Sequence, residues 1–257
     1  MDPNQDPIIR VENLTVAYDE TIILEDVSFE VNRAEVFIIL GGSGCGKSTL
    51  MKQMIGLHAP VSGHVHIDGQ DISTARGEER LAILRKIGVM YQSGALFGSM
   101  TLLENVRLPL EEFTALPFPA IDLIARMKLK LVGLGGFGNL MPAELSGGMR
   151  KRAAIARAMA LDPQILFLDE LSAGLDPITS AEMDRLVLDL ARNLGITFVI
   201  ITHELPSIYT IADRVIMLDK AAKGIIAKGR PRDLKDHSEK PWVRRFFNRE
   251  ALGDAST

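Results

Sequence analysis

"VFIILGGSGCGKST" (residues 36–49) decides the fold of this 257-residue chain. Its run of five apolar residues predicts a strand that is buried on both faces, as in a parallel sheet. The next residues match G-x-x-x-x-G-K-[ST] from Gly41 to Ser48, and a segment with helical spacing follows as far as Gly56. A glycine loop between a buried strand and a helix N-terminus is typical of a phosphate-binding loop. We therefore expect an α/β protein that binds a nucleotide.

The residue types of this loop suit phosphate chemistry. Glycines allow backbone N–H groups to curl around a phosphate, and the helix N-terminus adds a partial positive charge. Lys47 is expected to bridge the β- and γ-phosphates of ATP, and the Ser48 hydroxyl to ligate Mg²⁺. A glycine turn with a chance lysine is the alternative, but it does not account for the flanking strand and helix. The residues expected to contact the nucleotide here are Gly41, Gly42, Ser43, Gly44, Cys45, Gly46, Lys47, Ser48 and Thr49.

Polar residues also follow three other apolar strands. "ILFLDE" (residues 165–170) ends in Asp169 and Glu170. In a protein with a phosphate loop, the aspartate at this place orders Mg²⁺, and the adjacent carboxylate can act as general base toward the attacking water. Without such a loop, the pair would be an ordinary solvated strand end. Gln92 follows "GVMY" and His203 ends "FVIITH". Since ligands gather at the carboxyl ends of parallel strands, we expect both there, with Gln92 holding Mg²⁺ or the water.

The remaining pattern indicates the domain organisation. Alternating Val, Ile and Phe before residue 36 predict further strands, and helical spacing dominates from about 93 to 160. Strands and helices then alternate again, which favours a mostly parallel sheet with an inserted helical block. We expect one domain with a core of residues 1–92 and 161–235, a helical subdomain at 93–160 and a largely polar tail at 236–257.

Composition excludes several classes of protein. The net charge is −4, which argues against a protein that coats nucleic acid. No apolar run approaches the roughly 18 residues of a membrane span. The start "MDPNQDPIIR" lacks a basic segment followed by an apolar one, so we expect no secretory signal. Cys45 is the single cysteine, so no disulfide forms within the chain, and a reducing cytosol fits.

A second glycine loop opens "ELSGGMRKRAAIARAMA" (residues 144–160), and it has no lysine of its own. Ser146 is placed to cap the helix that follows. Its hydroxyl and the amides of Gly147 and Gly148 would offer hydrogen bonds to an anion at a helix N-terminus. A plain helix cap, without any ligand, is the alternative.

These motifs, in this order and at this spacing, resemble the ATP-binding subunits of ABC transporters from residue 8 to about 235. The resemblance implies a P-loop NTPase cassette with a mostly parallel core sheet, an antiparallel β subdomain and a helical subdomain. It implies that two copies pair head to tail and that Ser146, Gly147 and Gly148 cap the ATP of the partner. It further implies three roles, namely adenine stacking for Tyr18, γ-phosphate contact for His203 and an interface position for Asp176.

Two positions depart from the family pattern. Leu171 stands where proline usually follows the catalytic glutamate, and Met149 replaces the commoner glutamine. "QSGALF", "LSGGM" and "GLDPIT" further resemble the ATPase subunits of MCE-type lipid transporters of the Mla group. In this group, the C-terminal extension clasps the other subunit, and here it is shorter or altered.

The Mla resemblance implies a set of partners and a location. It implies an integral-membrane permease, a periplasmic MCE protein and a small STAS-domain protein, on the cytoplasmic side of the bacterial inner membrane. The system would move phospholipids between the two membranes and maintain outer-membrane asymmetry.

The resemblance to the wider ABC family implies that a cytoplasmic helix of the permease docks where the helical block meets the core. Phe97, Met100 and Leu102 are expected to line that groove, because an exposed apolar patch beside a ligand sensor is typical of a partner site. The alternative is that these side chains simply pack the helical block.

Three rival functions stay open at this level. One is an ABC ATPase that transports nothing, although such proteins typically have a long coiled coil or two cassettes. Another is a nucleotide-binding regulator that does not hydrolyse ATP, against which Glu170 and His203 argue. The last is a transporter for another solute, because the cassette does not touch the cargo.

Overall fold

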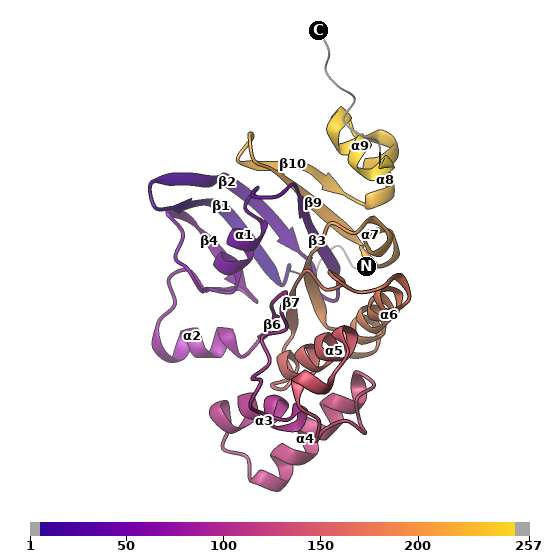
Figure 1. Cartoon of the computed structure of the whole chain (residues 1–257). Helices are drawn as coiled ribbons and strands as arrows, with labels where there is room; N and C mark the ends of the chain where they lie inside the picture. The colour runs from indigo at the N-terminus through magenta and orange to yellow at the C-terminus, as the bar shows by residue number, and fades with distance from the viewer. Residues whose placement is uncertain (1–5, 250–257) are drawn as a thin grey trace. The chain divides into compact units, whose positions relative to one another are not determined.

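In the computed structural model, residues 6–249 are described, and they form two compact units (Figure 1). The terminal unit comprises the residues up to Ala75 together with those from Ile201 onward. The central unit comprises Arg76–Ile200. Both units combine strands with helices, as the sequence predicts. Among the described residues, no helix combines the length and the apolar character that crossing a membrane requires.

The terminal unit begins with an antiparallel sheet whose strand order is β2-β1-β4-β5. Side chains of β1 alternate so that Ile9 and Val11 face the core, an irregularity at Asn13 (φ +47°) shifts the pattern by one residue, and Leu14 and Val16 then face the core. β2, β1 and β4 lie side by side in Figure 1. The strands are β1 (Ile9–Tyr18), β2 (Thr21–Val31), β4 (Ser62–Ile67) and β5 (Gln70–Asp71).

A second group of strands in the same unit carries the glycine loop. β3 (Val36–Gly41) is buried along its whole length, and it runs parallel to β9 (Arg214–Asp219). β10 (Gly224–Gly229) pairs antiparallel with β9. The helix α1 (Lys47–Met54) follows the loop and ends just before Gly56, as expected from the helical spacing.

Among the described residues from Ile201 onward there are three helices, and only the last lies wholly within the tail expected at residues 236–257. They are α7 (Leu205–Ile211), α8 (Pro231–His237) and α9 (Pro241–Asn248). Val243 and Phe247 of α9 are buried, and the hydroxyl of Tyr209 on α7 donates a hydrogen bond to the carbonyl oxygen of Phe247 at 2.9 Å. Trp242, Val243, Phe246 and Phe247 recur at helical spacing, and the burial of Val243 and Phe247 makes α9 an amphipathic helix.

The central unit has a core of three strands in the order β8-β7-β6. β6 (Ile87–Met90) pairs in parallel with β7 (Ile165–Asp169), and β8 is Thr197–Ile201. The long helix α6 (Pro177–Leu194) connects β7 to β8, as predicted. The short helix α2 (Gly77–Leu84) was not predicted, because Ile83 is its one buried residue and its apolar periodicity is weak.

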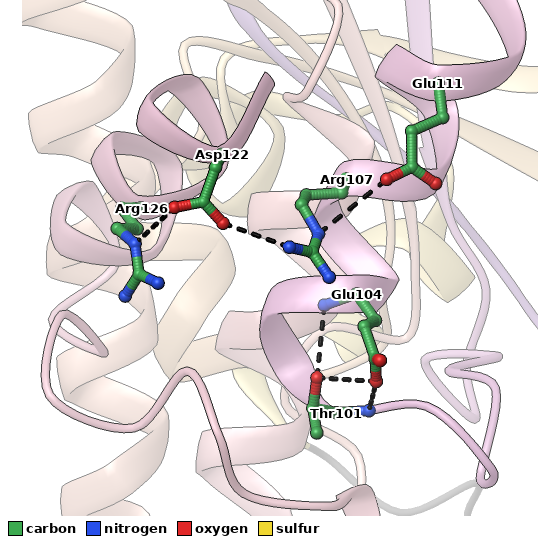
Figure 2. Close-up of polar contacts among 6 residues, drawn as sticks. All are labelled: Thr101, Glu104, Arg107, Glu111, Asp122 and Arg126. Carbon is green, nitrogen blue, oxygen red and sulfur yellow. Dashed lines mark hydrogen bonds and ion pairs between the residues drawn. The ribbon is translucent and has the colours of Figure 1, made fainter. Parts of the chain in front are cut away.

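Most residues between 102 and 158 are helical, within the range where helical spacing dominates the sequence. They form α3 (Leu102–Phe113), α4 (Phe118–Leu131), the short 3-10 helix η1 (Pro142–Glu144) and α5 (Gly147–Ala158). Thr101 and Glu104 form a capping box at the start of α3. Figure 2 shows this box and the ion pair that joins α3 to α4, in which Asp122 accepts from Arg107 at 3.0 Å and from Arg126 at 2.7 Å.

Candidate functional site

The glycine loop of the terminal unit takes a conformation that other residues would not tolerate. Gly41 has φ +146°, and a Cβ there would lie 2.5 Å from the carbonyl oxygen of Leu218 on β9. Gly46 caps α1 with φ +99°, against the side chains of Ile23 and Leu24. By contrast, a Cβ on Gly42 or Gly44 would meet no atom within 4 Å. The loop is therefore held firmly at both ends and open on its outer side, where a phosphate group fits.

Lys47 lies over this loop. Its Nζ donates hydrogen bonds to the carbonyl oxygens of Gly41 and Gly42, both at 2.9 Å. The ammonium is thus already at the mouth of the loop, where it can exchange a carbonyl for a phosphate oxygen. Ser43 and Ser48 are exposed and Thr49 is half-buried. Burial raises the pKa of the Cys45 thiol, and Lys47 opposes the rise, which leaves Cys45 a protonated packing residue.

Two further predicted residues lie in the same unit. Tyr18 ends β1 with its side chain 74% exposed, so its ring is accessible for stacking on a base. His203 is exposed in the loop between β8 and α7. The stacking role of Tyr18 and the phosphate role of His203 stay predictions.

The central unit brings three other predicted residues to one edge of its sheet. Met90 of β6 lies opposite Leu168 of β7. Gln92 and the pair Asp169 and Glu170 therefore leave the two strands at the same level. Burial, and then the charge of Asp169, raise the pKa of Tyr91, which lies between Met90 and Gln92. This edge is the one where ligands of parallel sheets bind.

Glu170 has an unusual backbone conformation, with φ +54°. A turn follows in which the N–H of Ala173 donates to the carbonyl oxygen of Glu170 at 3.3 Å, and that of Leu175 donates to Ser172 at 3.0 Å. Leu171, at the position where the family usually has proline, is 2% exposed. Its side chain therefore anchors the turn in the core, and the backbone is not fixed by a proline ring.

The second glycine loop begins α5 as predicted. The Oγ of Ser146 accepts a hydrogen bond from the N–H of Met149 at 3.2 Å, so Ser146 is the helix cap. Met149 has no group that could return a hydrogen bond to the cap. Gly148 is buried against Thr179 of α6, and a Cβ there would lie 2.5 Å from the Thr179 Cγ2. The loop thus has both the geometry of a helix cap and the first N–H groups of a helix, which have no acceptor within the helix itself.

Asp176 has a local role that the sequence analysis missed. Its Oδ1 accepts hydrogen bonds from the N–H groups of Ile178 and Thr179 at 3.0 Å each, so it caps α6. Its hydrogen bonds, of which that from the Thr179 hydroxyl is the strongest influence, lower the pKa of the carboxyl group. The signal was present in the sequence, since an acidic residue followed by proline is typical of a helix start.

The groove predicted at Phe97, Met100 and Leu102 is only partly compatible with the structure. Phe97 is 50% exposed and Met100 is half-buried, but Leu102 is completely buried, so its assignment to an exposed groove is wrong. Leu102 is the first residue of α3 and points into the core of the helical block. The buried amide of Asn105 holds this loop, because its Nδ2 donates to the carbonyl oxygens of Phe97, Met100 and Thr101 at 3.0–3.1 Å.

Two basic residues of α5 also contact loops, although nothing in the sequence pattern distinguishes them from other basic residues. Arg157 donates hydrogen bonds to the carbonyl oxygens of Ala95 at 2.6 Å and Gly94 at 3.1 Å, just after Gln92. Lys151 reaches the turn after β7. The sequence shows that both residues are basic. It does not show which carbonyl oxygens accept their hydrogen bonds, because that depends on which loops pack against α5.

Each unit holds an oxygen ligand of the kind that Mg²⁺ prefers. Among residues 6–249, no group of three or more His, Cys, Asp or Glu side chains is placed to hold a metal ion. Mg²⁺ is usually bound through one or two protein oxygens together with water and phosphate oxygens. The exposed hydroxyl of Ser48 and the half-buried carboxylate of Asp169 are of this kind.

Comparisons with known proteins agree with this geometry. The family model described as "ABC transporter" matches residues 24–173. The probable ribonucleotide transport ATP-binding protein mkl of Mycobacterium leprae (strain TN) is 42% identical over 245 residues, which cover 95% of this chain and 70% of the relative. The intermembrane phospholipid transport system ATP-binding protein MlaF of Escherichia coli (strain K12) is 37% identical over 246 residues. These residues cover 96% of this chain and 90% of the relative.

Solved structures give the same result for the fold. CbiO1 from Clostridium perfringens, part of the ABC transporter complex cbiONQ, has a TM-score of 0.82 and 31% identity, and the match covers 95% of this chain and 96% of that one. A dimeric ATP-binding cassette in a post-hydrolysis state with ADP and Pi has a TM-score of 0.78 and 31% identity. The match covers 86% of this chain and 98% of that one. The predicted fold class is confirmed. The chain therefore belongs to the ABC transporter family, as an ATP-binding subunit that hydrolyses ATP.

Proposed function

We propose that this chain drives a bacterial transporter that moves phospholipids between the inner and outer membranes. The observation that carries the proposal is the similarity to MlaF over 90% of that relative's length, together with a phosphate loop that is open to its ligand. The methionine of "LSGGM" and the "QSGALF" segment also resemble the Mla group. The chain would lie on the cytoplasmic side of the inner membrane, with an integral permease, a periplasmic MCE protein and a small STAS-domain protein as partners.

A second cargo is supported by the name of another relative. The mkl protein is described as a probable ribonucleotide transporter subunit, and it is more similar to this chain, at 42% identity. MlaF, however, matches this chain over a larger share of its own length. Purification of the intact complex from native membranes and mass spectrometry of the bound molecules would decide between them. Bound phospholipid supports the first cargo, and bound nucleotide outside the ATP sites supports the second.

For the chemical step, we propose that ATP binds with Mg²⁺ between two copies of the chain. Lys47 holds the phosphates, Ser48 and Asp169 hold Mg²⁺, and Gln92 contacts the metal or the water. Glu170 acts as general base, and His203 contacts the γ-phosphate. Tyr18 stacks on the adenine, while Ser146, Gly147, Gly148 and Asp176 lie at the interface with the partner's ATP. The proposed division into a core of residues 1–92 and 161–235, a helical subdomain at 93–160 and a tail at 236–257 serves this arrangement.

Glu170→Gln tests the chemical step, because it removes the base with almost no change of shape. General bases typically contribute about a hundredfold or more to the rate. We expect turnover to fall by about that factor, while ATP still binds and stabilises a dimer that gel filtration detects. Turnover at the parental rate would exclude Glu170 as the base.

A further inference from the structure

The side chain of Lys151 connects the second glycine loop to the backbone of Glu170. Lys151 lies in the first turns of α5, which begins directly after Ser146. Its side chain is almost completely buried, and its Nζ donates hydrogen bonds to the carbonyl oxygens of Glu170 and Ala173, both at 2.8 Å. One ammonium group thus holds both ends of the turn that follows β7. All of these residues belong to the central unit.

This turn needs such support. The backbone of Glu170 lies in the left-handed region, which residues other than glycine rarely adopt. The next residue is Leu171, so no proline ring fixes the chain there. Hydrogen bonds from a charged donor are about twice as strong as neutral ones, and a buried ammonium is stable only when such acceptors surround it. The position of Lys151 and the conformation of Glu170 therefore stabilise each other.

We propose that Lys151 is a positioning residue for ATP hydrolysis, and that it acts by holding the backbone of Glu170 in the conformation that aims its carboxylate. The proposal rests on the proposed role of Glu170 as the general base. Lys151 itself contacts neither nucleotide nor water in this role. Because Ser146 to Gly148 begin the same helix, the loop that would cap one ATP and the base that would act on the other are then part of one rigid arrangement.

The test replaces Lys151 in the full-length chain and measures turnover, nucleotide affinity and thermal unfolding together. Lys151→Met keeps the length and burial of the side chain but removes both hydrogen bonds. We expect kcat to fall about tenfold or more, because a general base loses its effect when its geometry is lost. The KM and the affinity for ATP should stay within about threefold, because ATP binding does not require the base. Lys151→Arg, which keeps a charged donor, should restore part of kcat.

A neighbouring residue provides the matched control. Arg152 lies on the same helix and donates to the carbonyl oxygen of Val132 at 3.2 Å and to Glu182 at 2.9 Å, away from the Glu170 turn. Arg152→Met should lower the unfolding temperature and leave kcat within about twofold. If Lys151→Met and Arg152→Met lower kcat equally, the effect of Lys151 is one of general stability and the proposal is wrong.

A double variant distinguishes this proposal from the proposed role of Glu170. If Lys151 acts through Glu170, adding Lys151→Met to Glu170→Gln should lower the residual rate by no more than about twofold. If Lys151→Met lowers the rate of Glu170→Gln by the same factor as it lowers the rate of the parental chain, Lys151 acts independently of Glu170. Parental turnover of Glu170→Gln alone would instead refute the general base. If neither Lys151→Met nor Lys151→Arg yields a folded protein, Lys151 is a residue of the fold, and the positioning role is refuted.

Discussion

Gly148 and Thr179 lie so close together that a Cβ on Gly148 would be 2.5 Å from the Cγ2 of Thr179. The threonine cannot rotate away without cost, because its hydroxyl donates to the Oδ2 of Asp176 at 2.5 Å. Gly148→Ala should therefore separate the start of α5 from α6 and destabilise the protein by about 1–3 kcal/mol. Urea unfolding of the purified variant measures this loss.

A second substitution makes this prediction specific. Thr179→Ser removes the Cγ2 methyl group and keeps the hydroxyl that bonds Asp176. The double variant Gly148→Ala with Thr179→Ser should therefore recover most of the lost stability. If the double variant is as unstable as Gly148→Ala alone, the close contact between the two helices is not the cause.

The ion pair between Arg107 and Asp122 predicts a dependence of stability on pH (Figure 2). The Arg126 hydrogen bond, with a further contribution from Arg107, lowers the pKa of Asp122 below the usual value of an aspartate. The pKa of Asp122 is therefore lower in the folded chain than in the unfolded chain. The interaction stabilises the folded protein at pH values above the unfolded-state pKa, and this stabilisation is lost as the pH falls through the folded-state pKa. We expect a coupling of about 0.5–1 kcal/mol between the two residues at pH 7, from a double-mutant cycle with Arg107→Met and Asp122→Asn.

The same cycle repeated at lower pH gives the check. The coupling should be constant above about pH 5 and shrink as the pH falls further. A coupling that is the same at pH 7 and at the lowest pH that the folded chain tolerates would show that the pair is held by packing, including the contact of Arg107 with the ring of Phe118 at 4.9 Å.

Lys47→Ala tests the phosphate loop. The ammonium now bonds two loop carbonyls, and each hydrogen bond from a charged group to phosphate contributes about 1.5–3 kcal/mol. We expect the affinity for ATP to fall at least about tenfold, as measured with a fluorescent nucleotide. Lys52→Ala, on the same helix α1, is the control and should bind ATP normally. Equal affinities of the two variants would refute the role of Lys47.

Phe97→Asp tests the proposed contact with the permease. Phe97 is 50% exposed, and Arg157 lies 5.9 Å from its ring centroid, so a carboxylate there is tolerated beside a positive charge. The variant should fold and bind ATP but should no longer co-purify with the permease. Phe113→Asp is the matched control, because Phe113 is similarly exposed, at 48%, at the far end of α3. A Phe97→Asp variant that still assembles would remove Phe97 from the interface.

Elements that depend on neighbouring residues could be predicted from the sequence. A run of apolar residues followed by glycines and Lys47 was sufficient for a buried strand, a phosphate loop and a helix. Ser146 before two glycines was sufficient for a helix cap, and helical spacing gave the block between β6 and β7. In each case, the residues that decide the conformation lie within a few positions of one another.

Tertiary structure alone decided what depends on distant parts of the chain. Leu102 looked like a surface residue because apolar character does not reveal which side of a helix faces the core. The helix α9 is stabilised by the burial of Val243 and Phe247, and the sequence does not show which part of the protein buries them. Lys151 could not be matched to the carbonyl of Glu170, 19 residues later, because that contact depends on how α5 packs beside the end of β7. Backbone carbonyls are present at every residue, so only the packed structure selects the one that a buried lysine binds.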